Sequence, residues 1–256
     1  MSVIKTKGIV LKYCNMNDND RLFTLFCPEI GKISALSKGI RSHKHKDFAA
    51  LQPFCFSEFV IDNSKGLGYI TSAQVCENFY ALRESVEKTS LASYITDLVS
   101  GISDEIIYDD DFFRFILNTL YVIAKIPDSE HFITDLLKLK SVFELKTICV
   151  AGYMPATDVC MVCNCKKDLK YFDVWEGGTV CEDCQMRGAS PELVEISSPA
   201  CNMIKFICDA DYKAVFKFNA SLETIDEVNR IGEIYLINKL EFVSAQLEYF
   251  KNIISQ

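Results

Sequence analysis

The sequence predicts an α+β protein of more than one domain, in which a small β-barrel precedes a mainly helical region with a cysteine-rich insertion. Residues 1–80 contain short segments with the two-residue alternation of β-strands, whereas apolar residues recur at helical spacing from about residue 81 onward. Residues 160–184 hold five of the chain's 12 cysteines. We therefore expect a barrel domain over 1–80 and a helical domain over 81–256, with a knuckle at 155–190.

Strand-like segments follow one another closely in the first 80 residues, and turn residues separate them. The run RLFTLFC is rich in β-branched and aromatic residues, and the turns PEIG and NSKG each contain a glycine. Five such strands suit a small closed barrel, for which the five-stranded oligonucleotide-binding (OB) fold is the natural candidate. Strand count alone does not separate it from other small barrels. The expected strands are 3–13, 21–27, 31–40, 53–62 and 67–75.

The helical region begins with three amphipathic segments that we expect to form a bundle. The second segment follows the acidic run at 109–111, which complements the positive dipole of a helix N-terminus, and Pro127 closes it. Further along, Ser198 and Pro199 are typical of an N-cap and a first-turn proline. The expected helices are 78–102, 112–126, 130–152, 198–209 and one long final helix over 222–252.

The knuckle contains two C-x2-C pairs, Cys160 with Cys163 and Cys181 with Cys184. A two-residue spacing lets one tight turn present both thiolates to a single ion, and the separation of the pairs is typical of a four-cysteine zinc site. Cys165 is a rival ligand, although one residue between it and Cys163 suits a shared tetrahedral ion poorly. Four thiolates would close the zinc shell, which favours one structural Zn²⁺ over a catalytic ion. The alternative is four buried free thiols.

Positive charge concentrates within residues 31–54, in the middle of the barrel region. The whole chain has a formal net charge of −8, but residues 1–80 carry 10 Lys/Arg and 7 Asp/Glu. A run of cations in a strand and the loop after it would neutralise DNA phosphates without reading sequence, although such a run is often only a solvated loop. Base stacking is a possible role for Phe23, Phe26 and Phe48, but we expect these side chains to lie in the barrel core. The expected DNA-binding residues are Arg21, Lys32, Lys38, Arg41, Lys44 and Lys46.

Several classes of protein are disfavoured. The sequence contains no phosphate-binding G-x-x-x-x-G-K-[ST] loop, no H-E-x-x-H zinc motif and no G-x-S-x-G nucleophile motif, so we expect no enzyme activity. It has no apolar run of membrane-spanning length, and its first residues lack the apolar core of a signal peptide. We therefore expect a cytoplasmic protein without a membrane partner.

Specific stretches, in a specific order, resemble the bacterial RecO family of recombination mediators. The similarity spans essentially the whole chain. It begins with KGIVLKY and continues through NDNDRLFTLFCPEIGKISALSKGIRS and LQPF. FELKTICVAGYMP then leads into CMVC and GGTVCEDC, before a helical tail. The run from Asp20 to Arg41 and the join of AGYMP to a C-x2-C pair are the most specific parts.

This resemblance implies a DNA repair and recombination function. It implies an OB-fold that binds single- and double-stranded DNA, annealing of complementary strands without ATP, and loading of the RecA recombinase together with RecR. It also implies contact with single-strand-binding protein, a functional link to RecF, and a place at the bacterial nucleoid. The DNA-binding role would fall on the basic positions and the zinc role on the paired cysteines. The alternative is a non-catalytic adaptor whose barrel binds a protein partner.

Overall fold

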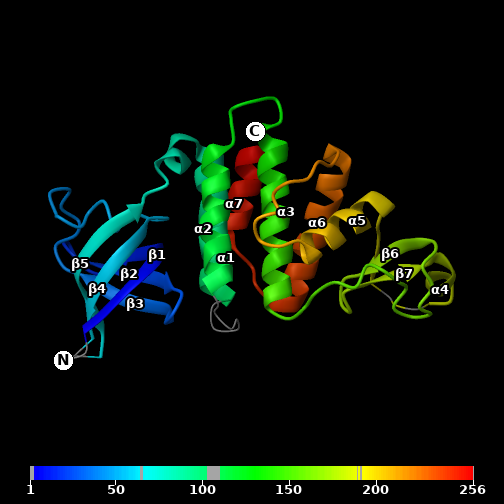
Figure 1. Ribbon diagram of the computed structural model, residues 1–256, viewed down its shortest axis with the longest axis horizontal. Coiled ribbons are helices and arrows are strands. Elements are labelled where there is room, and N and C mark those ends of the chain that lie inside the picture. Colours follow the sequence, from blue (N-terminus) through cyan, green and yellow to red (C-terminus); the bar gives the residue numbers. More distant parts are fainter. Residues whose placement is uncertain (1–2, 64–65, 103–109, 189, 191, 256) are drawn as a thin grey trace. The chain divides into compact units, whose positions relative to one another are not determined.

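The computed structural model describes residues 3–63, 66–102, 110–188, 190 and 192–255. The chain divides into two compact units, the first formed by Met1–Lys125 with Ser244–Gln256 and the second by Ile126–Val243 (Figure 1). No helix in the described ranges is long and apolar enough to cross a membrane.

The first unit contains a closed five-stranded barrel, as the sequence predicts. Its strands are hydrogen-bonded in the order β1-β2-β3-β5-β4, with β1 paired to β4 to close the ring. All pairings are antiparallel except the short parallel pairing of β3 with β5, which is the arrangement of an OB-fold. The strands are β1 (Val3–Asn15), β2 (Arg21–Cys27), β3 (Gly31–Ser37), β4 (Phe56–Asp62) and β5 (Gly68–Glu77).

The barrel interior is filled by alternate side chains of the strands and by the segment that joins β3 to β4. This segment contributes the buried residues Ile40, Leu51 and Cys55 to the same apolar cluster as Phe23 and Phe59. β4 therefore begins three residues later than the sequence predicts, because residues 53–55 belong to the connecting segment. Of the turn expected at 63–66, residues 64 and 65 lie outside the described ranges.

Four helices in the described ranges complete the first unit beside the barrel strands. They are the 3-10 helix η1 (Tyr80–Glu84), α1 (Val86–Ile102), α2 (Asp110–Lys125) and α7 (Ala245–Ile254). The Phe113 ring of α2 lies 6.0 Å from the Phe26 ring and 5.8 Å from the Phe56 ring, which joins α2 to two strands. The change from strand to helix near residue 80 is where the sequence predicts it. The boundary between compact units lies elsewhere, at Lys125, because α1 and α2 pack against the barrel and α7 packs against α1.

The helix expected over 222–252 is two helices, so that prediction is wrong. α6 (Leu222–Leu240) ends where Glu241 adopts a left-handed conformation with φ of 48°. Ser244 then caps α7 by accepting hydrogen bonds from the backbone N–H groups of Gln246 and Leu247. The break separates the units, since α6 belongs to the second and α7 to the first.

The second unit is built on the packing of α3 (Phe132–Val150) against α6. α5 (Ser198–Asp209) contacts both, and its N-cap is Ser197 rather than the predicted Ser198, since the Ser197 hydroxyl accepts the N–H of Ala200. The knuckle is an insertion between α3 and α5. It consists of β6 (Leu169–Asp173), β7 (Gly178–Cys181), the short helix α4 (Glu182–Met186) and β8 (Leu193–Glu195).

Acidic residues stand at the start of α2, as predicted. Asp110 and Asp111 occupy its first turn, where both lie within ion-pair distance of Arg114, at 3.9 and 3.6 Å. Their carboxylates thus complement the helix dipole and a cation one turn away. Residue 109, the other member of the acidic run, lies outside the described ranges.

Candidate nucleic-acid interface and metal centre

The turn between β1 and β2 is tied to the segment that follows β3. The Asn17 side chain accepts the N–H groups of Asn19 and Asp20, which closes the turn. The Asp20 carboxylate then accepts the N–H of Gly39 at 2.8 Å, and the Arg41 guanidinium donates to the Asn17 carbonyl at 2.8 Å. Hydrogen bonds from Asn17 and Gly39 lower the pKa of Asp20, so this acceptor is ionised at neutral pH. These bonds hold Arg41 beside the first residue of β2.

Aromatic rings lie beneath the cations at this end of the barrel. The Arg21 guanidinium lies 4.0 Å from the centroid of the Tyr13 ring, and its Nε donates to the Asn15 side chain. The Lys38 ammonium lies 5.3 Å from the centroid of the Tyr69 ring. A cation over an aromatic face keeps its charge while the ring limits its rotamers. The arrangement therefore presents positive charge and aromatic surface together, as single-stranded nucleic-acid sites do.

Five of the six basic residues predicted to contact DNA lie at this end of the barrel. Arg21 faces Ser37 across β2 and β3, so it is next to Lys38. Lys46 donates to the carbonyl of Thr71 in β5, and the exposed Lys44 ammonium has no hydrogen bond or ion pair to the residues that the structure describes. We call this group the basic end; it comprises Arg21, Lys38, Arg41, Lys44 and Lys46.

Lys32 is the exception. It stands at the other end of β3, six residues and roughly 20 Å along the strand from Lys38. Its ammonium donates to the carbonyl of Ser100, in the last turn of α1. The structure therefore does not bring Lys32 to the basic end, because a strand separates residues that are near in sequence.

The three phenylalanines that the sequence assigns to the core are packed inside. Phe23 and Phe26 are buried, and Phe48 packs against the barrel cluster. The aromatic residues that accompany the basic end are tyrosines, Tyr13 and Tyr69, which the sequence reasoning missed. A β-bulge between Val10 and Lys12 shifts the register of β1, so alternation counted from the start of the strand does not locate Tyr13.

The knuckle brings cysteine thiols together as a candidate metal centre. The Sγ atoms of Cys160, Cys163, Cys165 and Cys181 all lie within 4.8 Å of one another. A tetrahedral ion with Zn–S bonds of about 2.3 Å needs sulfur–sulfur distances of about 3.8 Å, and the Cys163 and Cys181 sulfurs are 3.7 Å apart. The four sulfurs therefore need only small side-chain shifts to hold a metal ion.

Backbone donors favour the thiolate form at this centre. Burial opposes ionisation of the Cys160 thiol, yet N–H groups of Cys181, Cys163 and Val162 lower its pKa to about 6. The Cys181 N–H lies 3.4 Å from the Cys160 sulfur. A metal binds the thiolate, so these N–H groups prepare Cys160 for coordination.

The group of four close sulfurs differs from the predicted ligand set by one residue. Cys165 belongs to it, although its spacing from Cys163 disfavours it, because Asn164 adopts a left-handed conformation with φ of 61° that turns the chain back. Cys184, the predicted fourth ligand, lies in α4 and packs against Cys160 and Cys181 in the same buried cluster. Five thiols thus compete for four positions.

Comparisons with known proteins identify relatives over nearly the full length. The family model described as Recombination protein O N terminal matches residues 1–79, and the model described as Recombination protein O C terminal matches residues 83–243. The DNA repair protein RecO of Acetivibrio thermocellus is 30% identical over 256 residues, which are 99% of this chain and 98% of the relative. The same-named protein of Caldicellulosiruptor saccharolyticus is 31% identical over 255 residues, 99% of this chain and 100% of the relative.

Proposed function

Because the chain belongs to the recombination protein O (RecO) family of DNA repair proteins, we propose that it is a non-catalytic recombination mediator. It binds single- and double-stranded DNA and anneals complementary strands without ATP. With RecR, and in functional connection with RecF, it loads RecA onto DNA that single-strand-binding protein covers. It acts in the bacterial cytoplasm at the nucleoid.

The observation that carries this proposal is the basic end of the barrel. Two DNA strands repel each other through their phosphates, and cations that bind the phosphates release condensed counterions and lower that repulsion. Arg21 and Lys38 stand over the Tyr13 and Tyr69 rings, and Tyr13 is 38% exposed, so bases on the same strand also find aromatic surface. Annealing then needs only that two strands are held close enough for base pairing to begin, which involves no covalent step.

The rest of the chain suits protein partners better than DNA. Residues 81–256 carry 17 Lys/Arg and 28 Asp/Glu, so this region is strongly acidic. Negative charge disfavours contact with phosphates and favours basic surfaces on other proteins. We assign RecR and single-strand-binding protein to this region rather than to the basic end.

The knuckle's role in this proposal is structural, with one Zn²⁺ ion as its staple. Cys160, Cys163 and Cys181 are ligands in either possible set, and the fourth is Cys184 by sequence spacing or Cys165 by proximity. Four thiolates leave no coordination site for water, so the ion would cross-link the knuckle and supply no chemistry. The knuckle sheet has three short strands and can bury only a small apolar core, so a metal cross-link would stabilise it.

Annealing of two complementary oligonucleotides, without ATP and across a salt series, tests the function. We expect the protein to accelerate annealing at low salt and to lose this effect as salt rises, because phosphate contacts are exchanged for counterions. A protein that neither binds the oligonucleotides nor accelerates annealing at low salt would contradict the proposal. That result would favour the adaptor alternative, in which the barrel binds a protein.

A further inference from the structure

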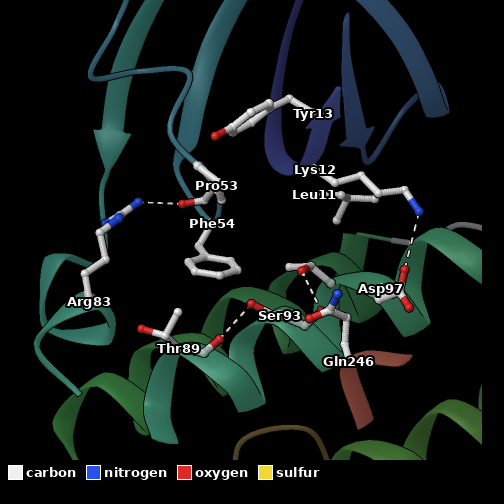
Figure 2. A pocket seen from close by; sticks show the side chains of 11 residues that line it. Leu11, Lys12, Tyr13, Pro53, Phe54, Arg83, Thr89, Ser93, Asp97 and Gln246 are labelled. Carbon is white, nitrogen blue, oxygen red and sulfur yellow. Dashed lines mark hydrogen bonds and ion pairs between the residues drawn. The ribbon is translucent and has the colours of Figure 1, made fainter. Parts of the chain in front are cut away.

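A cavity of about 400 Å³ lies in the first unit beside the basic end (Figure 2). Its volume is within the roughly 300–1,000 Å³ of small-ligand pockets. One wall comes from β1 and from Pro53 and Phe54, which precede β4, and the floor is one face of α1. Gln246, from the first turn of α7, completes the lining. The cavity is open to solvent and thus accessible to a ligand.

The walls of the cavity are mainly aromatic and aliphatic. Tyr13, whose residue surface is 38% exposed, stands above it, and Phe54 and Leu11 lie below and beside it (Figure 2). Tyr13 packs on Phe23 at 5.8 Å between ring centroids, which fixes its orientation. The open space between the Tyr13 and Phe54 side chains suits a flat, apolar-faced group.

Phe54 is held in an unfavourable backbone conformation. Its φ is 71°, in the left-handed region that a bulky side chain rarely adopts. Its N–H donates to the carbonyl of Val10, and the Arg83 guanidinium donates to the carbonyl of Pro53 just before it. Backbone strain of this kind concentrates at ligand sites, where the surrounding structure maintains it. Here it directs an aromatic ring into the cavity.

The floor provides hydrogen-bonding groups for the edge of such a ligand. The hydroxyls of Thr89, Ser93 and Thr96 each donate to a backbone carbonyl, so their oxygens remain free to accept. The Gln246 amide offers both a donor and an acceptor, which is the pattern that reads the edge of a base. A purely apolar ligand would leave these groups unused.

The charges at the rim favour an anionic ligand chain. Arg83 and Lys12 line the cavity, and Asp97, which pairs with Lys12 at 3.4 Å, is the one acidic residue of the lining among the residues that the structure describes. Arg21 adds a further cation, since it lies over the same Tyr13 ring that overhangs the cavity. Tyr13 thus lies under a cation of the basic end and also overhangs the cavity, so a strand bound to one reaches the other.

We propose that this cavity accepts an unpaired base of single-stranded DNA whose phosphates lie on the basic end. The base stacks on Tyr13 and Phe54 and turns its polar edge toward Ser93 and Gln246. This inference rests on the proposed function and adds a base-binding site to it. A base held in the cavity would leave its strand extended and unstacked, which is the state from which pairing with a second strand begins.

Two oligonucleotides of equal length and charge separate base binding from phosphate binding. One is oligothymidylate, and the other carries abasic tetrahydrofuran sugars in place of all nucleosides. We expect the wild-type protein to bind oligothymidylate about tenfold or more tightly, from one or two stacked bases. Ser93→Phe fills the cavity and should reduce this preference to near unity, with unchanged affinity for the abasic strand. Ser129→Phe, at an exposed residue outside the cavity, is the matched control.

Each other outcome overturns the inference in a recognisable way. If the wild-type protein binds both strands equally tightly, phosphate binding would be supported and the proposed base-binding site would be contradicted. If the folded Ser93→Phe variant still prefers oligothymidylate to the abasic strand, bases must bind outside the cavity. The cavity would then be a candidate site for a protein segment. Failure of the wild type to bind either strand would remove the proposed function as well.

Photocrosslinking gives a readout without any variant, should Ser93→Phe fail to fold. A thymidine oligonucleotide with single 5-iododeoxyuridine substitutions crosslinks to aromatic rings that its bases stack on. We expect adducts on Tyr13 or Phe54 in the wild-type protein. Adducts confined to Tyr69 would overturn the inference, because Tyr69 lies at the basic end but does not line the cavity.

Discussion

The Lys32 ammonium donates a hydrogen bond of 3.1 Å to the carbonyl oxygen of Ser100. This bond joins the start of β3 to the last turn of α1, at the negative end of the helix dipole. A lysine that belongs by sequence to a basic run is therefore a helix-capping residue in the fold.

Replacement of Lys32 by Met should reduce stability without affecting DNA binding. Loss of the bond and of a cation at the helix end should lower the free energy of unfolding by about 1 kcal/mol. Urea denaturation and oligonucleotide titration measure the two effects. Lys38→Met is the matched control and should give the opposite pattern, with weaker binding and unchanged stability. Equal losses of DNA affinity in both variants would return Lys32 to the DNA interface.

The salt dependence of DNA binding should show whether the cations of the basic end contact the phosphates. The triple substitution Lys38→Gln, Arg41→Gln and Lys44→Gln removes three cations, so the slope of log affinity against log salt should become less steep by about 2 for single strands. We expect at least about tenfold weaker binding at low salt. A control with Lys167, Lys213 and Lys217 changed to Gln has the same charge change at exposed residues of the second unit. Identical slopes in both triple variants would show that net charge alone governs binding.

Single cysteine substitutions should define the metal ligands. Cys181→Ser should lower bound zinc from one equivalent and lower the melting temperature, because Cys181 is close to every other thiol of the centre. Cys165→Ser and Cys184→Ser form a matched pair, of which only the true fourth ligand should release zinc. Zinc content by mass spectrometry and a chelator competition would measure this. If the Cys181→Ser variant keeps one equivalent of zinc and the wild-type melting temperature, the proposed structural zinc site would be refuted.

A buried ion group in the second unit should be a strong determinant of its stability. The Lys140 ammonium lies 2.9 Å from Glu144 and 3.2 Å from Glu233, and Lys140 and Glu144 are 2% and 0% exposed. Lys140→Met should destabilise the protein by about 3–5 kcal/mol, because it removes the cation that lies 2.9 Å from the buried Glu144 carboxylate.

The double variant Lys140→Met with Glu144→Leu tests that reason. Because the double variant lacks both charges, it should regain much of the free energy of unfolding that Lys140→Met loses, as measured by urea denaturation. A double variant no more stable than Lys140→Met alone would mean that shape at these positions, rather than charge, is what the unit requires.

Local pattern predicted the strands because each half-buried strand repeats every two residues. All five expected strands exist, and β2 has the predicted bounds. The same logic failed at α6 and α7, where an apolar stripe continues across residues 241–244 and only the left-handed Glu241 and the Ser244 cap interrupt the helix. Side-chain periodicity does not record a backbone turn between two helices whose apolar faces happen to be in phase.

The candidate sites divide in a similar way. Residue type and short spacing are local properties, so the sequence is enough to predict a barrel with clustered cations and cysteines paired at metal-binding spacing. Strand register sets neighbours across a sheet, so only the fold places Arg21 next to Lys38 and leaves Lys32 apart. The fold also decides that Cys165 joins the thiols and that Tyr13 overhangs a cavity, through a left-handed Asn164 and a β-bulge that spacing does not record.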